Sequence, residues 1–145
     1  MENNKVLSII IPTYNMAELL PRCLQSLLDS PRKEELDVIV VNDGSKDNSL
    51  EVAMDFQRRY PGIVNVIDKP NGNYGSTINA ALPVAKGKYV KILDSDDWFD
   101  TQALTQFLAA LHTLRVGRKG DFNIVSGFVC GNVHLSFRGI HRYLH

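Results

Sequence analysis

The chain has 145 residues, of which 44% are hydrophobic and 22% are charged, a composition typical of a soluble globular domain with one core. Its 16 basic and 16 acidic side chains give a formal net charge of zero, which argues against a nucleic-acid partner. No stretch approaches the length of a transmembrane helix, and Cys23 and Cys130 lack the CxxC spacing of a zinc site. We interpret both cysteines as core residues in a reducing compartment.

Strand-like apolar runs alternate with amphipathic, helix-like runs along the chain. The strands are predicted at 6–11, 36–41, 63–67, 89–93 and 122–129. The helices are predicted at 17–28, at 48–60, from 76 as a short or kinked helix because of Pro83, and from 101 to 114. This alternation predicts an α/β fold with a Rossmann-like, mostly parallel sheet and helices on both faces. The first strand is expected to stop at Pro12, because proline cannot donate to a strand ladder.

Polar loops follow the first, second and fourth predicted strands. They contain Thr13-Tyr14-Asn15, Asp43-Gly44-Ser45 and Asp94-Ser95-Asp96-Asp97. Carboxyl ends of parallel strands lie at one edge of a sheet, so these loops are expected to converge there. A fourth loop, Gly72–Ser76, contains two glycines that let backbone N–H groups approach a phosphate.

The three acids after the fourth strand have two interpretations. In an extended chain Asp94 and Asp96 would point the same way, roughly 6–7 Å apart, and would suit Mg²⁺ or Mn²⁺ shared with a phosphate. Alternatively, the acids only begin the next helix, with Asp97 or Asp100 as its N-cap. The spacing alone leaves both interpretations open.

Two further loop residues are ambiguous when each is considered alone. Tyr14 offers a flat face for a base or sugar, but exposed tyrosines are common in loops. Asp43 offers a hydrogen-bond acceptor for a base or ribose, but it also suits a turn that caps the next helix. Together with the acids and the glycine loop, they describe a nucleotide-diphosphate site in which a metal stabilises the leaving group.

The segments Ser8–Asn15, Val40–Asp47 and Gly87–Asp97, together with Asn79, resemble the family 2 glycosyltransferases of the GT-A fold, in the family's order and over residues 6 to about 114. The resemblance implies a nucleotide-sugar donor, most often a UDP-sugar, Mn²⁺ or Mg²⁺ as cofactor, and a saccharide or lipid-linked acceptor. It implies the donor-binding residues Pro12, Thr13, Tyr14, Asn15, Asp43, Gly75, Asn79, Asp94 and Ser95. It also implies a DxD motif with the metal ligands Asp96, Asp94 and Asp97.

The C-terminal segment departs from the family. Inverting sugar transfer needs a general base, yet residues 122–145 contain no Asp or Glu and only His134, His141 and His145 as possible bases. We interpret His141 and His145 as exposed tail residues and assign no catalytic residue. We therefore expect a truncated GT-A domain over residues 1–129, which binds the nucleotide-sugar, and an atypical tail over 130–145.

Such a chain is expected to bind the donor with a metal but to transfer sugar poorly or not at all. The alternative is a non-catalytic nucleotide-sugar-binding module. We expect a cytoplasmic protein, and the sequence leaves open both its oligomeric state and a peripheral association with the inner face of the membrane.

Overall fold

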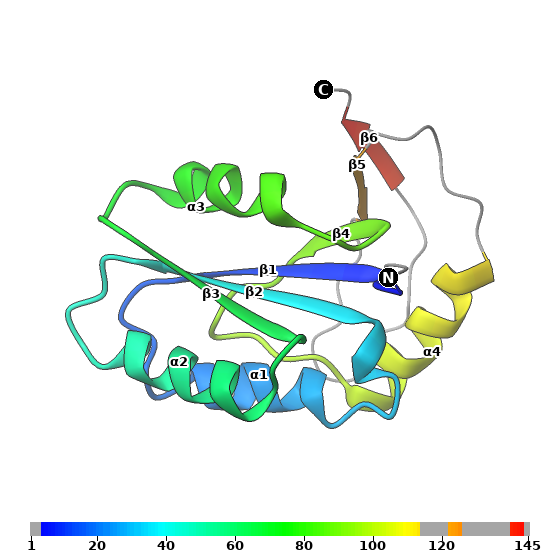
Figure 1. The fold of residues 1–145 in the computed structure, drawn as a ribbon, viewed down its shortest axis with the longest axis horizontal. Helices are drawn as coiled ribbons and strands as arrows, with labels where there is room; N and C mark the ends of the chain where they lie inside the picture. Colours follow the sequence, from blue (N-terminus) through cyan, green and yellow to red (C-terminus); the bar gives the residue numbers. More distant parts are fainter. Residues whose placement is uncertain (1–3, 114–121, 126–139, 144–145) are drawn as a thin grey trace.

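The computed structural model describes residues 4–113, 122–125 and 140–143. In chain order its elements are β1 (Leu7–Thr13), α1 (Leu20–Leu28), η1 (Lys33–Glu35), β2 (Leu36–Asp43), α2 (Ser49–Arg59), β3 (Val64–Lys69), α3 (Tyr74–Ala81), η2 (Leu82–Val84), β4 (Tyr89–Ile92), α4 (Thr101–Thr113), β5 (Phe122–Val125) and β6 (Ile140–Tyr143). The strands form one sheet in the order β3-β2-β1-β4-β5-β6 (Figure 1). Strands β1 to β5 are parallel and β6 is antiparallel, which confirms the predicted mostly parallel α/β fold.

The C-terminal predictions are only partly covered by the structure. The expected strand 122–129 is described as far as Val125, and β6 lies within the segment 130–145 that we interpreted as a tail. Cys130, His134 and His145 lie outside the described residues. The division of the chain at residue 129 therefore stays a prediction.

Helices cover both faces of the sheet, as predicted (Figure 1). Helices α1, α2 and α4 pack on one face, where the apolar positions at helical spacing are buried: Leu24, Leu27, Ala53, Phe56, Leu104 and Leu108. On the opposite face, Ala81 of α3 packs against Ile10, Ile39 and Val90 of the sheet. No helix in the described part of the chain combines the length and the apolar character needed to cross a bilayer.

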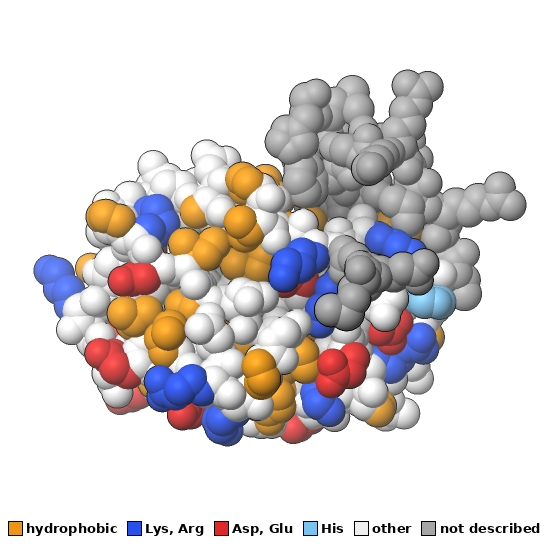
Figure 2. Space-filling model, viewed as in Figure 1, with side chains coloured by type: hydrophobic (Ala, Val, Ile, Leu, Met, Phe, Trp, Pro, Cys, Tyr) orange, Lys and Arg blue, Asp and Glu red, His pale blue; other side chains and the backbone are white. Residues whose placement is uncertain are grey.

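The outer surface of the helical layer carries both signs of charge. Acidic and basic side chains are interspersed along the lower side of the molecule in Figure 2. On α2, the Asp55 carboxylate pairs with Arg58 at 3.5 Å and with Arg59 at 3.0 Å. Exposed pairs of this kind contribute at most about 1 kcal/mol, so buried Phe56 does more than they do to hold α2 on the sheet.

Strand β1 extends through Pro12 to Thr13, so the prediction that it stops at Pro12 was wrong. Position 12 faces the same neighbour as Ile10, whose carbonyl accepts a hydrogen bond from the Leu93 N–H at 2.9 Å. The pairing of β1 with β4 ends at Ile10 and Ile92, before it reaches position 12. The missing N–H of proline therefore removes no ladder hydrogen bond on that side.

Helices α1 and α3 begin at other residues than the sequence predicts. Helix α1 begins three residues after position 17, with Pro21 in its first turn. Helix α3 begins at Tyr74, two residues before position 76, because Asn73 and Ser76 form a capping box. The Asn73 side chain accepts from the Ser76 N–H at 2.8 Å, and the Ser76 hydroxyl accepts from the Asn73 N–H at 3.0 Å. As predicted, α3 is short, and Pro83 follows in the 3₁₀ turn η2.

A buried polar network joins the amino ends of β1 and β2 to the segment before β4. The Ser8 hydroxyl donates to the Asp37 carboxylate at 2.7 Å and accepts from the Gly87 N–H at 2.8 Å. The Lys86 N–H also donates to Asp37, at 2.8 Å. A Cβ atom at Gly87 would lie 2.4 Å from the Ser8 nitrogen, so only glycine lets the chain pass this close to β1.

Candidate nucleotide-sugar site

The chain order of the strands creates the site. The connections from β1 to β2 and from β2 to β3 lead away in one direction, whereas β4 lies on the other side of β1. Such a switch in strand order opens a crevice at the carboxyl ends of the central strands, and ligands bind there in open α/β sheets. The loops after β1, β2 and β4 converge at this edge, as predicted.

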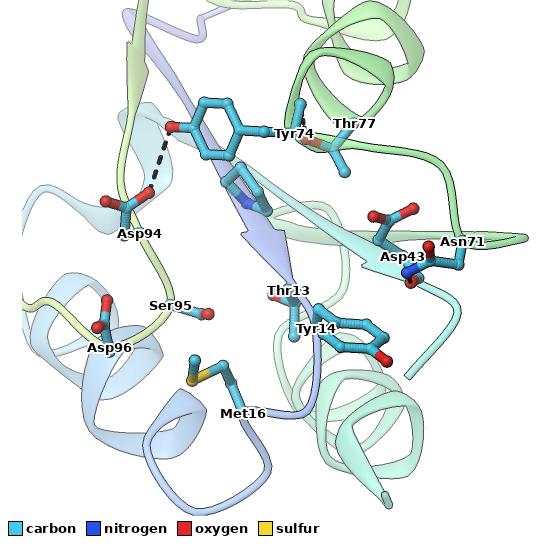
Figure 3. Close-up of a pocket in the computed structure, with 11 residues that line it drawn as sticks. Thr13, Tyr14, Met16, Asp43, Asn71, Tyr74, Thr77, Asp94, Ser95 and Asp96 are labelled. Carbon is cyan, nitrogen blue, oxygen red and sulfur yellow. Dashed lines mark hydrogen bonds between the residues drawn. The ribbon is translucent and has the colours of Figure 1, made fainter. Parts of the chain in front are cut away.

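A pocket of about 430 Å³ occupies this crevice (Figure 3). It is lined by Pro12, Thr13, Tyr14, Met16, Asp43, Asn71, Tyr74, Thr77, Asp94, Ser95 and Asp96. Seven of these residues are predicted site residues, which come from the carboxyl ends of β1 and β2 and from the loops after β1 and β4. The predicted residues Asn15, Gly75, Asn79 and Asp97 are not part of this lining. The roles of all the predicted residues in binding stay predictions.

Asp43 lies at one end of the pocket, opposite the acids that follow β4 (Figure 3). Its Oδ1 atom accepts hydrogen bonds from the Lys69 ammonium and from the Gly72 N–H, both at 2.9 Å. Burial raises the pKa of this carboxyl, but the bonds from Lys69 and Gly72 outweigh burial and hold the pKa below its ordinary value. Asp43 is therefore a fixed, charged acceptor, and it does not cap α2.

Asn15 holds two of the converging loops together. Its backbone is left-handed, with φ of 52°, a conformation that asparagine tolerates better than most residues. The Asn15 Oδ1 atom accepts from the Lys46 N–H at 2.7 Å, and the Asn15 N–H donates to the Ser45 hydroxyl at 3.0 Å. These contacts join the loop after β1 to the loop after β2 beside the pocket.

The acids after β4 lie on a turn, and the chain is not extended there as the predicted separation of Asp94 and Asp96 assumed. The Asp97 N–H donates to the Asp94 carbonyl at 2.9 Å and closes this turn. One carboxylate oxygen from each of Asp94, Asp96 and Asp97 lies within 4.8 Å of the other two. Asp100, not Asp97, caps α4, because its Oδ1 atom accepts from the Ala103 N–H at 2.8 Å. The cap interpretation thus holds for Asp100, and the metal interpretation of Asp94, Asp96 and Asp97 stays a prediction.

Side chains of helix α1 contact this acidic turn and hold it in place. The Arg22 guanidinium donates to the Asp96 carbonyl at 3.3 Å and stacks 3.7 Å from the centroid of the Trp98 ring. One turn further along α1, the Ser26 hydroxyl accepts from the Phe99 N–H at 3.1 Å. The buried Phe99 side chain then anchors the end of the segment in the core.

The family model described as glycosyl transferase family 2 matches residues 8–117. The chain belongs to this family.

Relatives of this family 2 chain cover most of its length. An uncharacterized glycosyltransferase of Mycoplasma pneumoniae is 36% identical over 133 residues, which are 90% of the chain and 42% of the relative. A poly(ribitol-phosphate) beta-glucosyltransferase of Bacillus spizizenii is 36% identical over 70% of the chain and 16% of the relative. S. aureus TarS in complex with UDP-GlcNAc has a TM-score of 0.62 and 31% identity, covering 74% of the chain and 31% of that TarS chain. The chain thus spans less than half the length of these relatives.

The acidic turn of this family 2 chain fits the divalent cation that the resemblance implies. It offers carboxylate oxygens, the hard donors that Mg²⁺ and Mn²⁺ prefer, from a small volume. Asp94 and Asp96 also line the pocket, so a cation held by these two residues and Asp97 would face a bound ligand.

Four residues that line the pocket of this glycosyltransferase-family domain are not among the residues predicted from the sequence: Met16, Asn71, Tyr74 and Thr77. Asn71 directly precedes the Gly72–Ser76 loop and Tyr74 lies within it, and only the glycines of this loop suggested a role in binding. A usable signal was present, because an asparagine and a tyrosine in a loop that follows a parallel strand lie at the ligand-binding edge. Thr77 is one helical turn beyond Tyr74, which places it on the same face of α3.

Cys23 of α1 lies directly behind the acidic turn of the family 2 site. It is fully buried, and its thiol lies 3.9 Å from the Asp94 carbonyl. Burial, followed by the negative charges of Asp97 and Asp96, raises the pKa of the Cys23 thiol to about 12. The predicted core position of this cysteine is confirmed.

This raised pKa predicts an unreactive thiol. In a Cys130→Ser background, iodoacetamide at pH 8.5 should label native Cys23 at least about 100-fold more slowly than in urea, as measured by intact mass. The ordinary pKa is 9.0, so the protonated thiol stabilises the fold fully below pH 9, and this contribution is lost as the pH rises towards 12. Equal labelling rates in the native and unfolded chains would contradict the buried position.

Proposed function

We propose that this pocket binds a nucleotide-diphosphate sugar, specifically a UDP-sugar, together with Mn²⁺ or Mg²⁺, for transfer to a saccharide or lipid-linked acceptor. The observation that carries the proposal is the position of Asp43 and the acidic turn at opposite ends of one pocket. The base and the diphosphate lie at opposite ends of a nucleoside diphosphate. A hydrogen-bond acceptor for the base and a metal for the diphosphate must therefore be separated in this way. The TarS complexes with UDP and with UDP-GlcNAc support the same choice of donor.

The nucleoside end of the proposed site is formed by Tyr14 and Asp43. Tyr14 is 42% exposed and presents its ring for stacking on a base. No described residue donates a hydrogen bond to Oδ2 of Asp43, whereas Lys69 and Gly72 donate to Oδ1. This oxygen would accept the ring N–H of uracil and would repel cytosine, whose ring nitrogen at the same position is an acceptor.

The diphosphate end of the proposed site is formed by the acidic turn. A divalent cation held by Asp96, with Asp94 and Asp97, supplies charge neutralisation that makes the diphosphate a better leaving group. The contacts of Arg22 and Ser26 hold this turn, so little of it needs to be reordered when the donor binds.

A second candidate function is donor binding without transfer. It is favoured by the pocket lining, because its three acids, Asp43, Asp94 and Asp96, are all assigned to the donor or the metal and none is left as the general base of an inverting reaction. Incubation with a UDP-sugar followed by mass analysis separates the two candidates. Released UDP supports a transferase, and an intact donor supports a binding module.

Isothermal titration calorimetry with UDP tests the binding proposal. We expect Mn²⁺ to increase the affinity for UDP at least about tenfold, a gain of about 1.4 kcal/mol, because it neutralises charge between the acidic turn and the diphosphate. CDP is the matched control and should bind more weakly than UDP at the same Mn²⁺ concentration. An affinity for UDP that does not depend on Mn²⁺, or equal affinities for CDP and UDP, would count against the proposed site.

A further inference from the structure

Tyr74 lies on the wall of the pocket and contacts one of the acids after β4. It is the first residue of α3, it is 54% exposed, and its ring lies across the pocket from Tyr14 (Figure 3). Its hydroxyl donates a hydrogen bond to Oδ1 of Asp94 at 3.2 Å. An exposed tyrosine on the wall of a pocket is thus directed at one acid of the turn after β4.

The backbone of Tyr74 is held firmly on the other side. The Thr77 hydroxyl donates to the Tyr74 carbonyl at 2.5 Å, and Ser76 belongs to the capping box that begins the helix. The Lys69 ammonium donates both to the Ser76 hydroxyl and to Asp43, each at 2.9 Å. The start of α3 is therefore fastened to the acceptor at the nucleoside end.

Asp94 has less support than Tyr74. Its side chain is exposed, and among the described residues the Tyr74 hydroxyl is the only group that donates a hydrogen bond to its carboxylate. Without that bond, rotation about χ1 would carry the carboxylate away from Asp96 and Asp97. The orientation of the exposed Asp94 carboxylate towards Asp96 and Asp97 therefore depends on its hydrogen bond with Tyr74.

We propose that Tyr74 is a positioning residue that orients Asp94 for the metal and thereby couples metal binding to nucleotide binding. The inference rests on the proposed function, because it assumes that Asp94 contributes to a metal site. Hydrogen-bond partners of metal ligands typically contribute 10- to 100-fold in metal affinity. Because the same helix start is fastened to Asp43, a nucleoside held there would also hold Tyr74 in place.

The substitution Tyr74→Phe tests this role, because it removes the hydroxyl and keeps the ring that lines the pocket. Mn²⁺ binding is followed by calorimetry and by the emission of Trp98, the only tryptophan of the chain and the neighbour of Asp97. We expect the affinity for Mn²⁺ to fall about tenfold. The enhancement of UDP binding by Mn²⁺ should fall in parallel, while UDP binding without metal changes less than about twofold.

Tyr60→Phe is the matched control. It removes a hydroxyl from a partly buried tyrosine at the end of α2, which stacks on Phe56 at 6.4 Å and does not line the pocket. This variant should keep the wild-type affinities for Mn²⁺ and UDP.

The outcomes separate this inference from the proposed function. Wild-type affinity for Mn²⁺ in Tyr74→Phe, with Mn²⁺-dependent UDP binding intact, would overturn the role of Tyr74 and leave the proposed function standing. If Tyr74→Phe lowered the metal-free affinity for UDP by the same factor as the affinity for Mn²⁺, and also lowered the thermal stability, the role of Tyr74 would be merely structural. That result would also overturn the inference. A wild-type chain that binds UDP without any dependence on Mn²⁺ would overturn both.

Discussion

Replacing Asp96 with asparagine is expected to remove most of the enhancement of UDP binding by Mn²⁺, which is a loss of at least about tenfold in the affinity for UDP in the presence of Mn²⁺. Asp96 lines the pocket, and its carboxylate is one of the three that form the proposed metal site. Its backbone carbonyl is held by Arg22, so the substitution changes the side chain and leaves the turn in place. Calorimetric titration of UDP with and without Mn²⁺ measures the effect, and UDP binding without metal should persist.

The control for this experiment is Asp100→Asn, four residues further along. It removes the same charge from the same segment, but Asp100 caps α4 and does not line the pocket. Asparagine caps helices about as well as aspartate, so this variant should fold and bind as the wild type does. Equal losses in the two variants would mean that the general negative charge of the segment, rather than a metal ligand, governs binding.

Replacing Gly87 with alanine is expected to destabilise the fold by about 3 kcal/mol, the upper end of the usual cost of overpacking. The added Cβ would lie 2.4 Å from the Ser8 nitrogen and 2.7 Å from the Leu7 carbonyl carbon. Both are backbone atoms of the central strand β1 and cannot rotate away. The shift would also disturb the hydrogen bond from the Gly87 N–H to the buried Ser8 hydroxyl.

Gly62→Ala is the matched control for Gly87→Ala, and urea unfolding followed by Trp98 emission measures both. A Cβ at Gly62 meets nothing within 4 Å, but the residue has φ of 81°. Its substitution should therefore cost only the left-handed strain of about 1–2 kcal/mol. A loss at Gly87 no larger than that at Gly62 would show that β1 gives way to the added methyl group.

The fold could be predicted because it depends on local patterns. Continuous apolar runs predicted strands that are buried on both faces, and the helical spacing of leucines predicted helices on both sides of a parallel sheet. The prediction that β1 stops at Pro12 was wrong because the sequence does not show where the pairing of β1 with β4 ends. The pairing of β1 with β4 ends at Ile10, and proline is tolerated beyond that point.

The candidate site could be predicted only as far as its strand ends. Asp43 ends β2 and Asp94 follows β4, so chain order alone places them at the same edge. Tyr74 follows no strand directly, and its contact with Asp94 joins residues 20 positions apart. The support of Asp96 by Arg22 joins residues 74 positions apart, beyond the reach of any local pattern.

The sequence by itself determined that this chain has a parallel α/β core and that three polar loops meet at one edge, because periodicity and the alternation of strands and helices are local properties. Only the tertiary structure decided how the acidic run is divided, with Asp100 as a helix cap and Asp94, Asp96 and Asp97 as one cluster. It also decided that Tyr74 holds Asp94. The physical reason is that each of these outcomes depends on the geometry of a hydrogen bond, which residue types and spacing do not specify. The contact of Tyr74 with Asp94 also requires that α3 and the segment after β4 lie close together in space.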